Sequence, residues 1–269
     1  MKLSDIRKRI KPISAFKLSE VADAHCTGIY FDVEDVDVLS LAIALVLVQQ
    51  FSLAKKLTID DTTPLVDISL EQSQIDSIIF RRLKPPNKYH RDGYLFQLMM
   101  WLSSHLDLQI GDLISLPHSQ ASAKGQDSLI IHRSSEAIGL SICEDKATIN
   151  PRETILAQVW PEITEYEKGD RDDELRSATI NILGTGGIDV EEAETLIKGI
   201  SWNGKRRYRV RVTIEDERSK NLFKGFTGIV AGADERRRGE TVLLPDMRNW
   251  MDGLALKIEA HLQKFVKAK

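Results

Sequence analysis

The sequence predicts an α/β protein, because strand patterns alternate with amphipathic helical patterns along its 269 residues. Two short runs rich in Ile and Leu, Ser128–Arg133 and Ala137–Lys146, have the composition of buried strands. A third run, Lys205–Ile214, alternates charged and apolar residues with the period of two that is typical of a strand. Apolar residues at helical spacing precede the first pair at Gly93–His105 and follow it from Pro151 to about Tyr166. Together these patterns predict a sheet flanked by helices.

The N-terminal part of the chain predicts a strand and a helix before a break. Gly28–Phe31 has strand character, and Val38–Phe51 is apolar enough to form a buried helix. The acidic run Asp32–Asp37 precedes that helix, where the helix dipole favours carboxylates. The paired prolines of Lys84–Asn87 end regular structure, so we place a loose domain boundary after residue 86.

The remaining elements are predicted from caps and periodicity. Asp92 is expected to cap the helix Gly93–His105, which would pack under the sheet. Asp189 and Glu192 form a capping box that begins a helix at Val190–Lys198. In the C-terminal part, the patterns predict strands at Gly225–Gly232 and Thr241–Leu244, and a helix from about Asp246. We therefore expect an N-terminal α/β elaboration at residues 1–86, a core at 87–214, and a C-terminal extension at 215–269 packed on that core.

Composition and charge exclude several classes of protein. The net charge is −3, so the whole molecule is not an electrostatic nucleic-acid binder, and any such surface must be local. Cys26 and Cys143 have no ligand-type spacing, which argues against a disulfide framework or a zinc site and suits a reducing cytoplasm. No signal-peptide core follows the basic start Met1–Lys11, and the longest apolar run, Val38–Val48, is too short to span a membrane. We expect a cytoplasmic protein with no membrane partner.

Charged groups gather at one end of the two Ile-rich strands. Asp127 opens the first strand, Glu144 and Lys146 close the second, and a Ser-Ser-Glu turn joins them. Because side chains alternate along a strand, Glu144 and Lys146 share one face while Asp145 points to the other. If the strands pair as a hairpin, Asp127 reaches the same end of the sheet. Two carboxylates there suit a hard cation such as Mg²⁺, and a lysine beside them would stabilise charge on a phosphate.

At these residues the chain resembles the PD-(D/E)XK, or restriction-endonuclease-like, nuclease superfamily, whose signature is an Asp, a spacer, then Asp or Glu, any residue, and Lys. Asp127, Glu144 and Lys146 match the signature residue by residue. The resemblance implies a restriction-endonuclease-like α/β core, a mixed sheet flanked by helices, with N- and C-terminal elaborations. It also implies that Asp127 and Glu144 bind Mg²⁺, which Mn²⁺ could replace, with the backbone carbonyl of Asp145 as a further ligand. Lys146 would then position the attacking water or stabilise the pentacovalent phosphate.

Not every feature of the superfamily is present. An acidic residue often stands in the first core helix, but here Gly93-Tyr94 occupies that place and the helix interior holds only Gln97. A third acidic ligand is therefore not predicted. The alternative reading of the hairpin is structural, with Glu144 and Lys146 forming an exposed salt bridge of little energetic value.

Three further residues are weaker candidates for the site. Arg152 and Gln158 lie on or near the helix that follows Lys146. The resemblance suggests that one polar residue of this helix reaches the site, and the alternative is that both are exposed. His118, in the loop before Asp127, could contact a phosphate, although a solvated loop histidine is the alternative.

A basic strand is the second informative stretch. Lys205, Arg207, Arg209 and Arg211 alternate with apolar residues, which would place four cations on one face. Such a face would bind the phosphates of a nucleic-acid backbone without reading its sequence. The alternatives are a solvated edge strand protected by its charge, or pairing with the acidic run Glu165–Glu174.

The expected function is metal-dependent hydrolysis of DNA phosphodiesters. The chain length and the layout from Gly125-Gln126-Asp127 to Glu144-Asp145-Lys146 resemble the nuclease subunit of Hachiman-type bacterial antiphage defence systems. That resemblance implies an antiviral role and a partner helicase that restrains the nuclease. The alternative from another class is a non-catalytic, nuclease-like adaptor on a nucleic-acid machine, and RNA is the alternative substrate.

Overall fold

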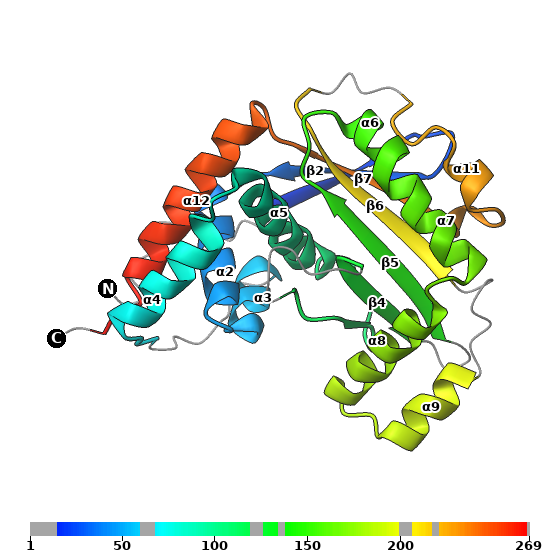
Figure 1. Cartoon of the computed structure of the whole chain (residues 1–269), viewed down its shortest axis with the longest axis horizontal. Coiled ribbons are helices and arrows are strands. Elements are labelled where there is room, and N and C mark those ends of the chain that lie inside the picture. Colours follow the sequence, from blue (N-terminus) through cyan, green and yellow to red (C-terminus); the bar gives the residue numbers. More distant parts are fainter. Residues whose placement is uncertain are drawn as a thin grey trace.

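The computed structural model describes residues 15–59, 68–118, 126–133, 138–198, 206–216 and 221–267, which contain one seven-stranded sheet. The strands lie side by side in the order β1-β2-β7-β6-β5-β4-β3 (Figure 1). Their bounds are β1 (Phe16–Val21), β2 (Thr27–Val33), β3 (Leu113–Ile114), β4 (Ser128–Arg133), β5 (Ile138–Lys146), β6 (Arg206–Ile214) and β7 (Arg237–Leu243).

The sheet is mixed. Strands β2, β7, β6 and β5 run parallel to one another, while β1 is antiparallel to β2, and β4 is antiparallel to both β5 and β3. The predicted α/β class with a mixed sheet is confirmed. Residues 1–86, 87–214 and 215–269 all contribute strands to this sheet, so the boundaries drawn from the sequence do not separate one sheet from another.

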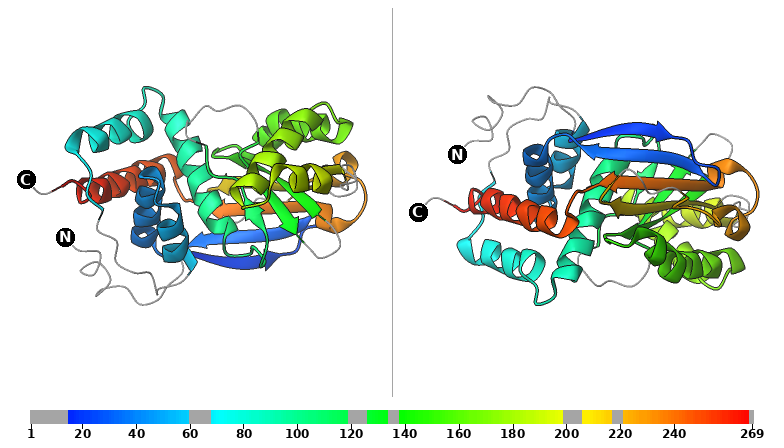
Figure 2. Two further views of the ribbon diagram at one scale, coloured as in Figure 1. Left: turned by 90° about the horizontal axis from the view of Figure 1, so that it is seen from below. Right: turned by 90° about the horizontal axis from the view of Figure 1, so that it is seen from above.

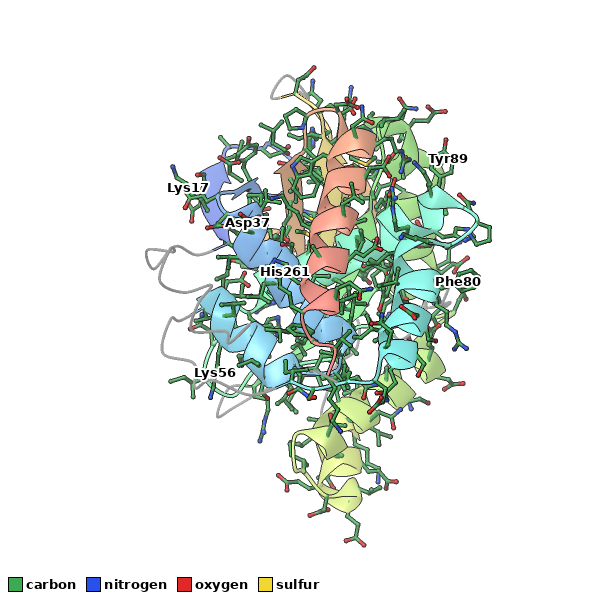
Figure 3. All side chains as sticks on the ribbon, turned by 90° about the vertical axis from the view of Figure 1, so that its left-hand side faces the viewer. Lys17, Asp37, Lys56, Phe80, Tyr89 and His261 are labelled. Atoms are coloured by element: carbon green, nitrogen blue, oxygen red, sulfur yellow. The ribbon has the colours of Figure 1, made fainter. Side chains whose placement is uncertain are left out.

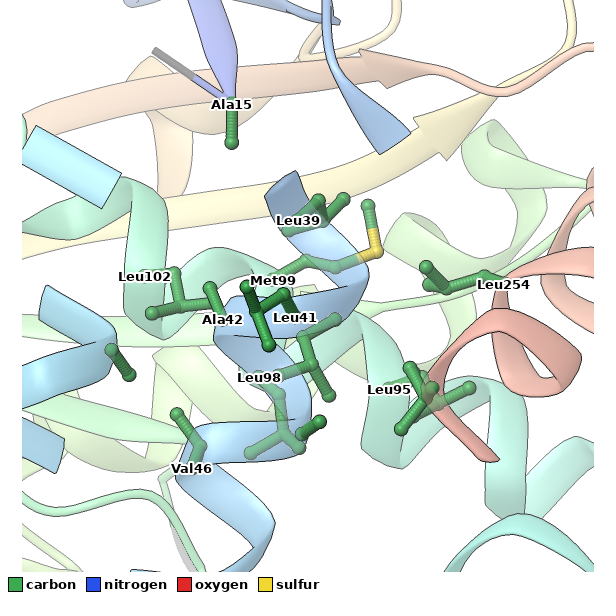
Figure 4. Packing of buried hydrophobic residues seen from close by; sticks show 14 of the residues in the cluster. Ala15, Leu39, Leu41, Ala42, Val46, Leu95, Leu98, Met99, Leu102 and Leu254 are labelled. Carbon is green, nitrogen blue, oxygen red and sulfur yellow. The ribbon is translucent and has the colours of Figure 1, made fainter. Parts of the chain in front are cut away.

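Helices from both ends of the chain cover one face of the sheet. This layer contains α2 (Val36–Leu47), α3 (Phe51–Ile59), α4 (Gln72–Ile78), α5 (Lys88–Ser104) and α12 (Met247–Gln263). Figure 4 shows α2 residues such as Leu39 packed among α5 residues such as Met99, near Leu254 of α12. Seen from outside, α12 lies between α2 and α4 (Figure 3).

The second face carries helices from the middle of the chain. They are α6 (Pro151–Thr154), the π-helical turn Ile155–Val159, α7 (Trp160–Lys168), α8 (Asp172–Thr185), α9 (Val190–Lys198) and the short α11 (Phe226–Ile229). These helices lie on the opposite side of the sheet from α2 and α12 (Figure 2). They bury the apolar side chains of β4, β5 and β6 in a second core. Each face of the sheet therefore has its own core, and every central strand is buried on both sides.

Most predicted elements agree with the structure. The two Ile-rich runs pair as β4 and β5, Thr27–Val33 contains the predicted first strand, and α9 begins and ends at the predicted residues. The amide of Glu192 donates to Oδ1 of Asp189 (2.9 Å), as the capping box requires. The helical stretch after Lys146 buries Ile155 and Val159 as predicted. Strand β7 includes most of the predicted Thr241–Leu244 strand but begins earlier because it pairs with both β2 and β6.

Three predicted elements differ from the structure. The helix predicted at Val38–Phe51 is interrupted by Gln49, whose φ of 61° is left-handed and ends the helix. The segment Gly225–Gly232 is not a strand, since both terminal glycines adopt positive φ and a helical turn lies between them.

The third difference concerns the residue at which α5 begins. The helix begins at Lys88, and the cap is the side chain of Asn87, which accepts from the amide of Tyr89 (2.9 Å). Asp92 is buried within the helix and forms ion pairs with Arg91 (2.7 Å) and Arg248 (2.5 Å). Charge-assisted hydrogen bonds to two guanidinium groups stabilise a carboxylate more than capping a helix end does.

Some predictions fall on residues outside those that the structure describes. These are the basic start Met1–Lys11, the Ser-Ser-Glu turn and Lys205. Among the described helices, none combines the length and the apolar character needed to cross a bilayer.

Candidate functional site

The two strands of the predicted hairpin bring Asp127 and Glu144 to the same end of the sheet. Ser128 is paired with Cys143, so Asp127 stands at the level of Glu144, and its amide donates to the carbonyl of Cys143 (3.2 Å). Neither carboxylate is on the outer surface, since Glu144 is 2% exposed and Asp127 is half-buried. The predicted juxtaposition of the two acids is therefore present.

Lys146 lies on the same side of β5 as Glu144. Its Nζ is 3.2 Å from Oε2 of Glu144 and 3.6 Å from Oε2 of Glu162 on α7. The exposed salt bridge considered as the structural alternative is wrong, because the side chains of Glu144 and Lys146 are only 2% and 19% exposed. A buried pair of this kind carries a desolvation cost that an exposed pair does not have.

Asp127 is held by donors from two sides. The side-chain amide of Gln97, on α5, donates to Oδ1, and the backbone amide of Asp145 donates to Oδ2 (2.6 Å). Burial raises the pKa of Asp127, while Lys146 and the Asp145 amide oppose the rise. Gln97 thus reaches the acidic pair from the helix in which the superfamily often carries an acid.

Asp145 points to the opposite face, as predicted, and its side chain is occupied. It forms a buried ion pair with Arg211, in which Nη2 lies 2.9 Å from Oδ2. The same guanidinium donates to Oγ of Ser104 (2.7 Å) and Oγ of Ser128 (2.8 Å). Only the backbone of Asp145 is left to act at the site.

The site holds more negative than positive charge. Asp127, Glu144 and Glu162 surround the single ammonium of Lys146, which leaves an excess of two negative charges when all are ionised. Burial raises the pKa of Glu144 well above its ordinary value, and Asp127 and Glu162 raise it further. Such a buried excess of charge is stabilised either by protons or by a cation.

The donor set suits a hard divalent cation. Oε1 of Glu144 is buried and has no hydrogen-bond partner among the described residues. With the carboxylate of Asp127, it supplies oxygen donors of the type that Mg²⁺ prefers. Asp127 and Glu144 would hold the ion. Within the described residues, no three or more His, Cys, Asp or Glu side chains are already arranged around a common metal position.

Of the three weaker candidates, one lies beside the acidic pair and two do not. His118 lies beside the site, where its Nε2 is 2.8 Å from the carbonyl of Gln126 and its charge lowers the pKa of Asp127. Arg152 faces elsewhere and donates to the carbonyls of Leu222 and Lys224, each at 2.8 Å. Gln158 is exposed.

Glu162 is the residue that the sequence reasoning missed. It lies on α7, four positions after Gln158 of the preceding π-helical turn, so the helical stretch after Lys146 was the correct place to look.

The cationic face predicted for β6 is wrong for two of its residues. Arg209 and Arg211 are 4% and 0% exposed, and Arg209 pairs with Glu240 (2.7 Å) and Asp107 (3.4 Å). Arg207 is exposed, and Lys205 lies outside the described residues. The edge-strand alternative is also wrong, since β6 lies between β5 and β7. Arg209 and Arg211 lie where this face is covered by other elements, so they pair with the buried acids Glu240 and Asp145.

The acidic run Glu165–Glu174 is engaged by neighbours of the predicted cations. Arg206 forms an ion pair with Asp172, and Oη of Tyr208 donates to Glu167 (2.6 Å). The basic strand therefore does pair with the acidic run, as the alternative proposed, but within the described residues it does so through Arg206 and Tyr208 and not through the predicted cations.

Two comparisons with known proteins found no match, so the interpretation of the site depends on its geometry. No protein-family model matches this sequence, and a search of curated proteins finds no match. The resemblance described above therefore depends on Asp127, Glu144 and Lys146 and on their arrangement.

Proposed function

We propose that this protein is a Mg²⁺-dependent nuclease that hydrolyses DNA phosphodiester bonds. The observation that carries the proposal is the convergence of Asp127, Glu144 and Lys146 at one end of the sheet, where the buried Oε1 of Glu144 has no hydrogen-bond partner in the part of the chain that the structure describes. Excess negative charge and oxygen donors are what a divalent cation needs. Mn²⁺ offers the same ligand preference and is the natural substitute.

Each residue has a separate role in the proposed reaction. A divalent metal ion, when bound, supplies Lewis acidity to a phosphoryl oxygen. Asp127 and Glu144 hold the ion, with the Asp145 carbonyl as the third proposed ligand. Lys146 carries a full positive charge, because Glu144 and Asp127 raise its pKa further above an already high value. Its ammonium would therefore stabilise the negative charge that develops on the phosphate.

The order of elements around the site supports a restriction-endonuclease-like core as part of the proposal. Helix α5 precedes β3, β4 and β5 and packs under the sheet, and α7 follows before the chain returns as β6, parallel to β5. The two acids thus lie on neighbouring strands between two helices. A role in antiphage defence beside a restraining helicase is the further expectation from the Hachiman resemblance.

One observation favours a non-catalytic adaptor as the second candidate. Gln97 stands where an acid would add a third ligand, and its amide already occupies one oxygen of Asp127 while the Asp145 amide occupies the other. In this state both oxygens of Asp127 are satisfied by hydrogen bonds within the protein, and the site could serve only to bind nucleic acid.

Cleavage of plasmid DNA in Mg²⁺, beside measurement of Mn²⁺ binding by calorimetry, tests the proposal. The variants are Glu144→Gln and Lys146→Met, which keep size, and the matched control is Glu165→Gln, on the exposed side of α7. We expect cleavage to fall about 100-fold or more in both variants, as for removal of a group that stabilises transition-state charge. Mn²⁺ binding should weaken in Glu144→Gln and persist in Lys146→Met.

The outcomes separate the two candidates. Cleavage that is unchanged in Glu144→Gln would exclude this site as the source of activity. DNA binding by the wild type without Mn²⁺ binding or cleavage would support the adaptor. Competition between DNA and RNA of equal length decides the substrate.

A further inference from the structure

A second cluster of polar residues lies on the other face of the sheet from Glu144. Helix α5 ends at Ser104, and beyond its end a pocket of about 280 Å³ opens over the strands. The turn after the helix forms one wall of this pocket, and the strands β4 to β7 form its floor. Among the residues that line it are Asp112, His132, Ser141, Arg207, Arg209 and Arg238, together with the acidic Asp107 and Glu235.

Three of these residues form a continuous hydrogen-bonded chain. Nε2 of His132 is 2.7 Å from Oγ of Ser141, and Nδ1 of His132 is 3.0 Å from Oδ2 of Asp112. An ionised carboxylate can only accept, so the neutral imidazole carries its proton on Nδ1. Nε2 is then an acceptor, and the hydroxyl of Ser141 donates to it. This is the arrangement in which a histidine can remove a proton from a serine.

The histidine is held in place, and its burial favours the neutral imidazole. Asp112, whose side chain is 4% exposed, also accepts from the backbone amides of Gln109 (3.2 Å) and Arg133 (3.3 Å). Burial lowers the pKa of His132, the contact with Asp112 raises it, and the nearby Arg207 and Arg209 lower it again. A neutral imidazole fixed in one orientation is what a general base requires.

A cation stands beside the serine. In the β5–β6 pairing Arg207 is directly opposite Ser141, and Arg207 is the exposed arginine of the strand. The two other arginines in the pocket are already paired, Arg209 with Glu240 and Arg238 with Asp107 (2.6 Å). Arg207 has no ion pair within the described residues, so its guanidinium is available to an anionic group on a ligand.

We propose that Ser141, His132 and Asp112 form a second catalytic site, in which Ser141 is an acyl-accepting nucleophile for small carboxylic esters that carry an anionic group. Oγ of Ser141 attacks the ester carbonyl, and its proton passes to Nε2 of His132. The carbon–oxygen bond of the ester breaks, and the alcohol leaves with that proton. Water, deprotonated by His132, then attacks the acyl carbon; the bond from that carbon to Oγ of Ser141 breaks, and His132 returns the proton to Oγ as the acid leaves. Asp112 is a positioning residue, and Arg207 binds the anionic end of the substrate.

Covalent labelling with an alkyl fluorophosphonate tests the nucleophile. Oγ of Ser141 would displace fluoride from phosphorus, and the proton would pass to His132. We expect one adduct per chain, located at Ser141 by peptide mass mapping and absent from Ser141→Ala. Ser115→Ala is the matched control, because its hydroxyl accepts from the amide of Leu129 and contacts no histidine in the described part of the chain.

Two variants distinguish a triad from a merely structural hydrogen-bonded chain. Labelling should slow by about 1,000-fold or more in His132→Gln and in Asp112→Asn, since each removes the oriented base. Thermal melting is measured on both, and if His132→Gln does not fold, Asp112→Asn carries the comparison because it keeps the side-chain volume. An unlabelled wild type, or equal labelling rates in a folded variant, would overturn the proposal.

Ester turnover tests the anionic substrate class. We expect mono-p-nitrophenyl succinate to be hydrolysed faster than the neutral p-nitrophenyl acetate, with the preference lost in Arg207→Gln. A wild type that prefers the acetate would overturn the assignment of Arg207 as the binding group.

Discussion

The backbone amide of Asp145 donates a 2.6 Å hydrogen bond to Oδ2 of Asp127, while the side chain of Asp145 forms a buried ion pair with Arg211 on the opposite face of the sheet. One residue therefore links the two faces. Because Arg211 also binds the carbonyl of Met100 (3.1 Å) and Oγ of Ser104 (2.7 Å) on α5, the position of Asp127 depends on how the helix is attached to the sheet.

Replacing Arg211 with Met should destabilise the fold severely. The variant leaves the carboxylate of Asp145 buried without a partner, which typically costs about 3–5 kcal/mol. The double variant Arg211→Met/Asp145→Leu removes both charges, and we expect it to be more stable than Arg211→Met. Urea unfolding gives both free energies, and Arg207→Met, an exposed site on the same strand, should change stability by less than about 0.5 kcal/mol. A single variant as stable as the double would show that the pair is not buried in this way.

Introducing an acid at the α5 position should strengthen metal binding. Gln97→Glu places a carboxylate against Oδ1 of Asp127, so without metal we expect a lower melting temperature than the wild type. Addition of Mg²⁺ should raise the melting temperature of Gln97→Glu more than that of the wild type, because ligand binding stabilises in proportion to ln(1 + [L]/Kd). Gln97→Met is the control, without the added charge. Equal Mg²⁺ responses in all three proteins would contradict the assignment of Gln97 to the metal environment.

Removing the charge of Glu162 should weaken metal binding without removing a proposed ligand. Glu162→Gln keeps the shape of the side chain near Lys146 but lowers the excess negative charge of the site by one. Calorimetry with Mn²⁺ should show affinity reduced by about 10-fold, the low end of the range for outer-shell changes. Glu165→Gln, on the exposed side of the same helix, should bind as the wild type does. Unaltered affinity in Glu162→Gln would show that Glu162 does not contribute to the field at the site.

Stability should fall in mild acid because of two buried histidines. Burial lowers the pKa values of His105 and His261 to about 4, from the ordinary 6.5, with a nearby lysine adding to the effect in each case. Below pH 6.5 the two histidines are protonated in the unfolded chain but stay neutral in the folded chain. The free energy of unfolding therefore decreases as the pH falls from about 6.5 towards 4. A depression of this size corresponds to roughly 3 kcal/mol for one histidine.

His105→Phe should remove its part of that pH dependence. Both ring nitrogens of His105 lack partners within the described residues, and the ring packs edge-on against Trp101 at 4.5 Å, a contact that Phe can keep. Urea unfolding between pH 4.5 and 7.5 should show a slope smaller by up to about 1.4 kcal/mol per pH unit, the value of one proton. The exposed His90→Gln is the control. An identical slope in His105→Phe would mean that this histidine titrates freely in the folded protein.

Local patterns were sufficient where neighbouring residues decide the outcome. The period of two along β5 places Glu144 and Lys146 on one side and Asp145 on the other, whatever the rest of the fold does. Apolar runs likewise predicted β4 and β5, because such runs are stable only when buried. The helix after Lys146 was predicted from its buried stripe, although Glu162, not Gln158, reaches the site from it.

Positions that depend on distant partners could not be predicted in this way. The alternation of Arg207, Arg209 and Arg211 indicated one shared face, but alternation does not say whether that face meets solvent or a helix. Asp92 shows the same limit, since a carboxylate suited to a helix cap was instead buried between two guanidinium groups, one of them Arg248 from the last helix. The sequence determined which strands form and which side chains share a face, because both follow from local backbone geometry. Only the tertiary structure decided which charges are buried, because the partners that neutralise them, such as Arg211 for Asp145, come from elsewhere in the chain.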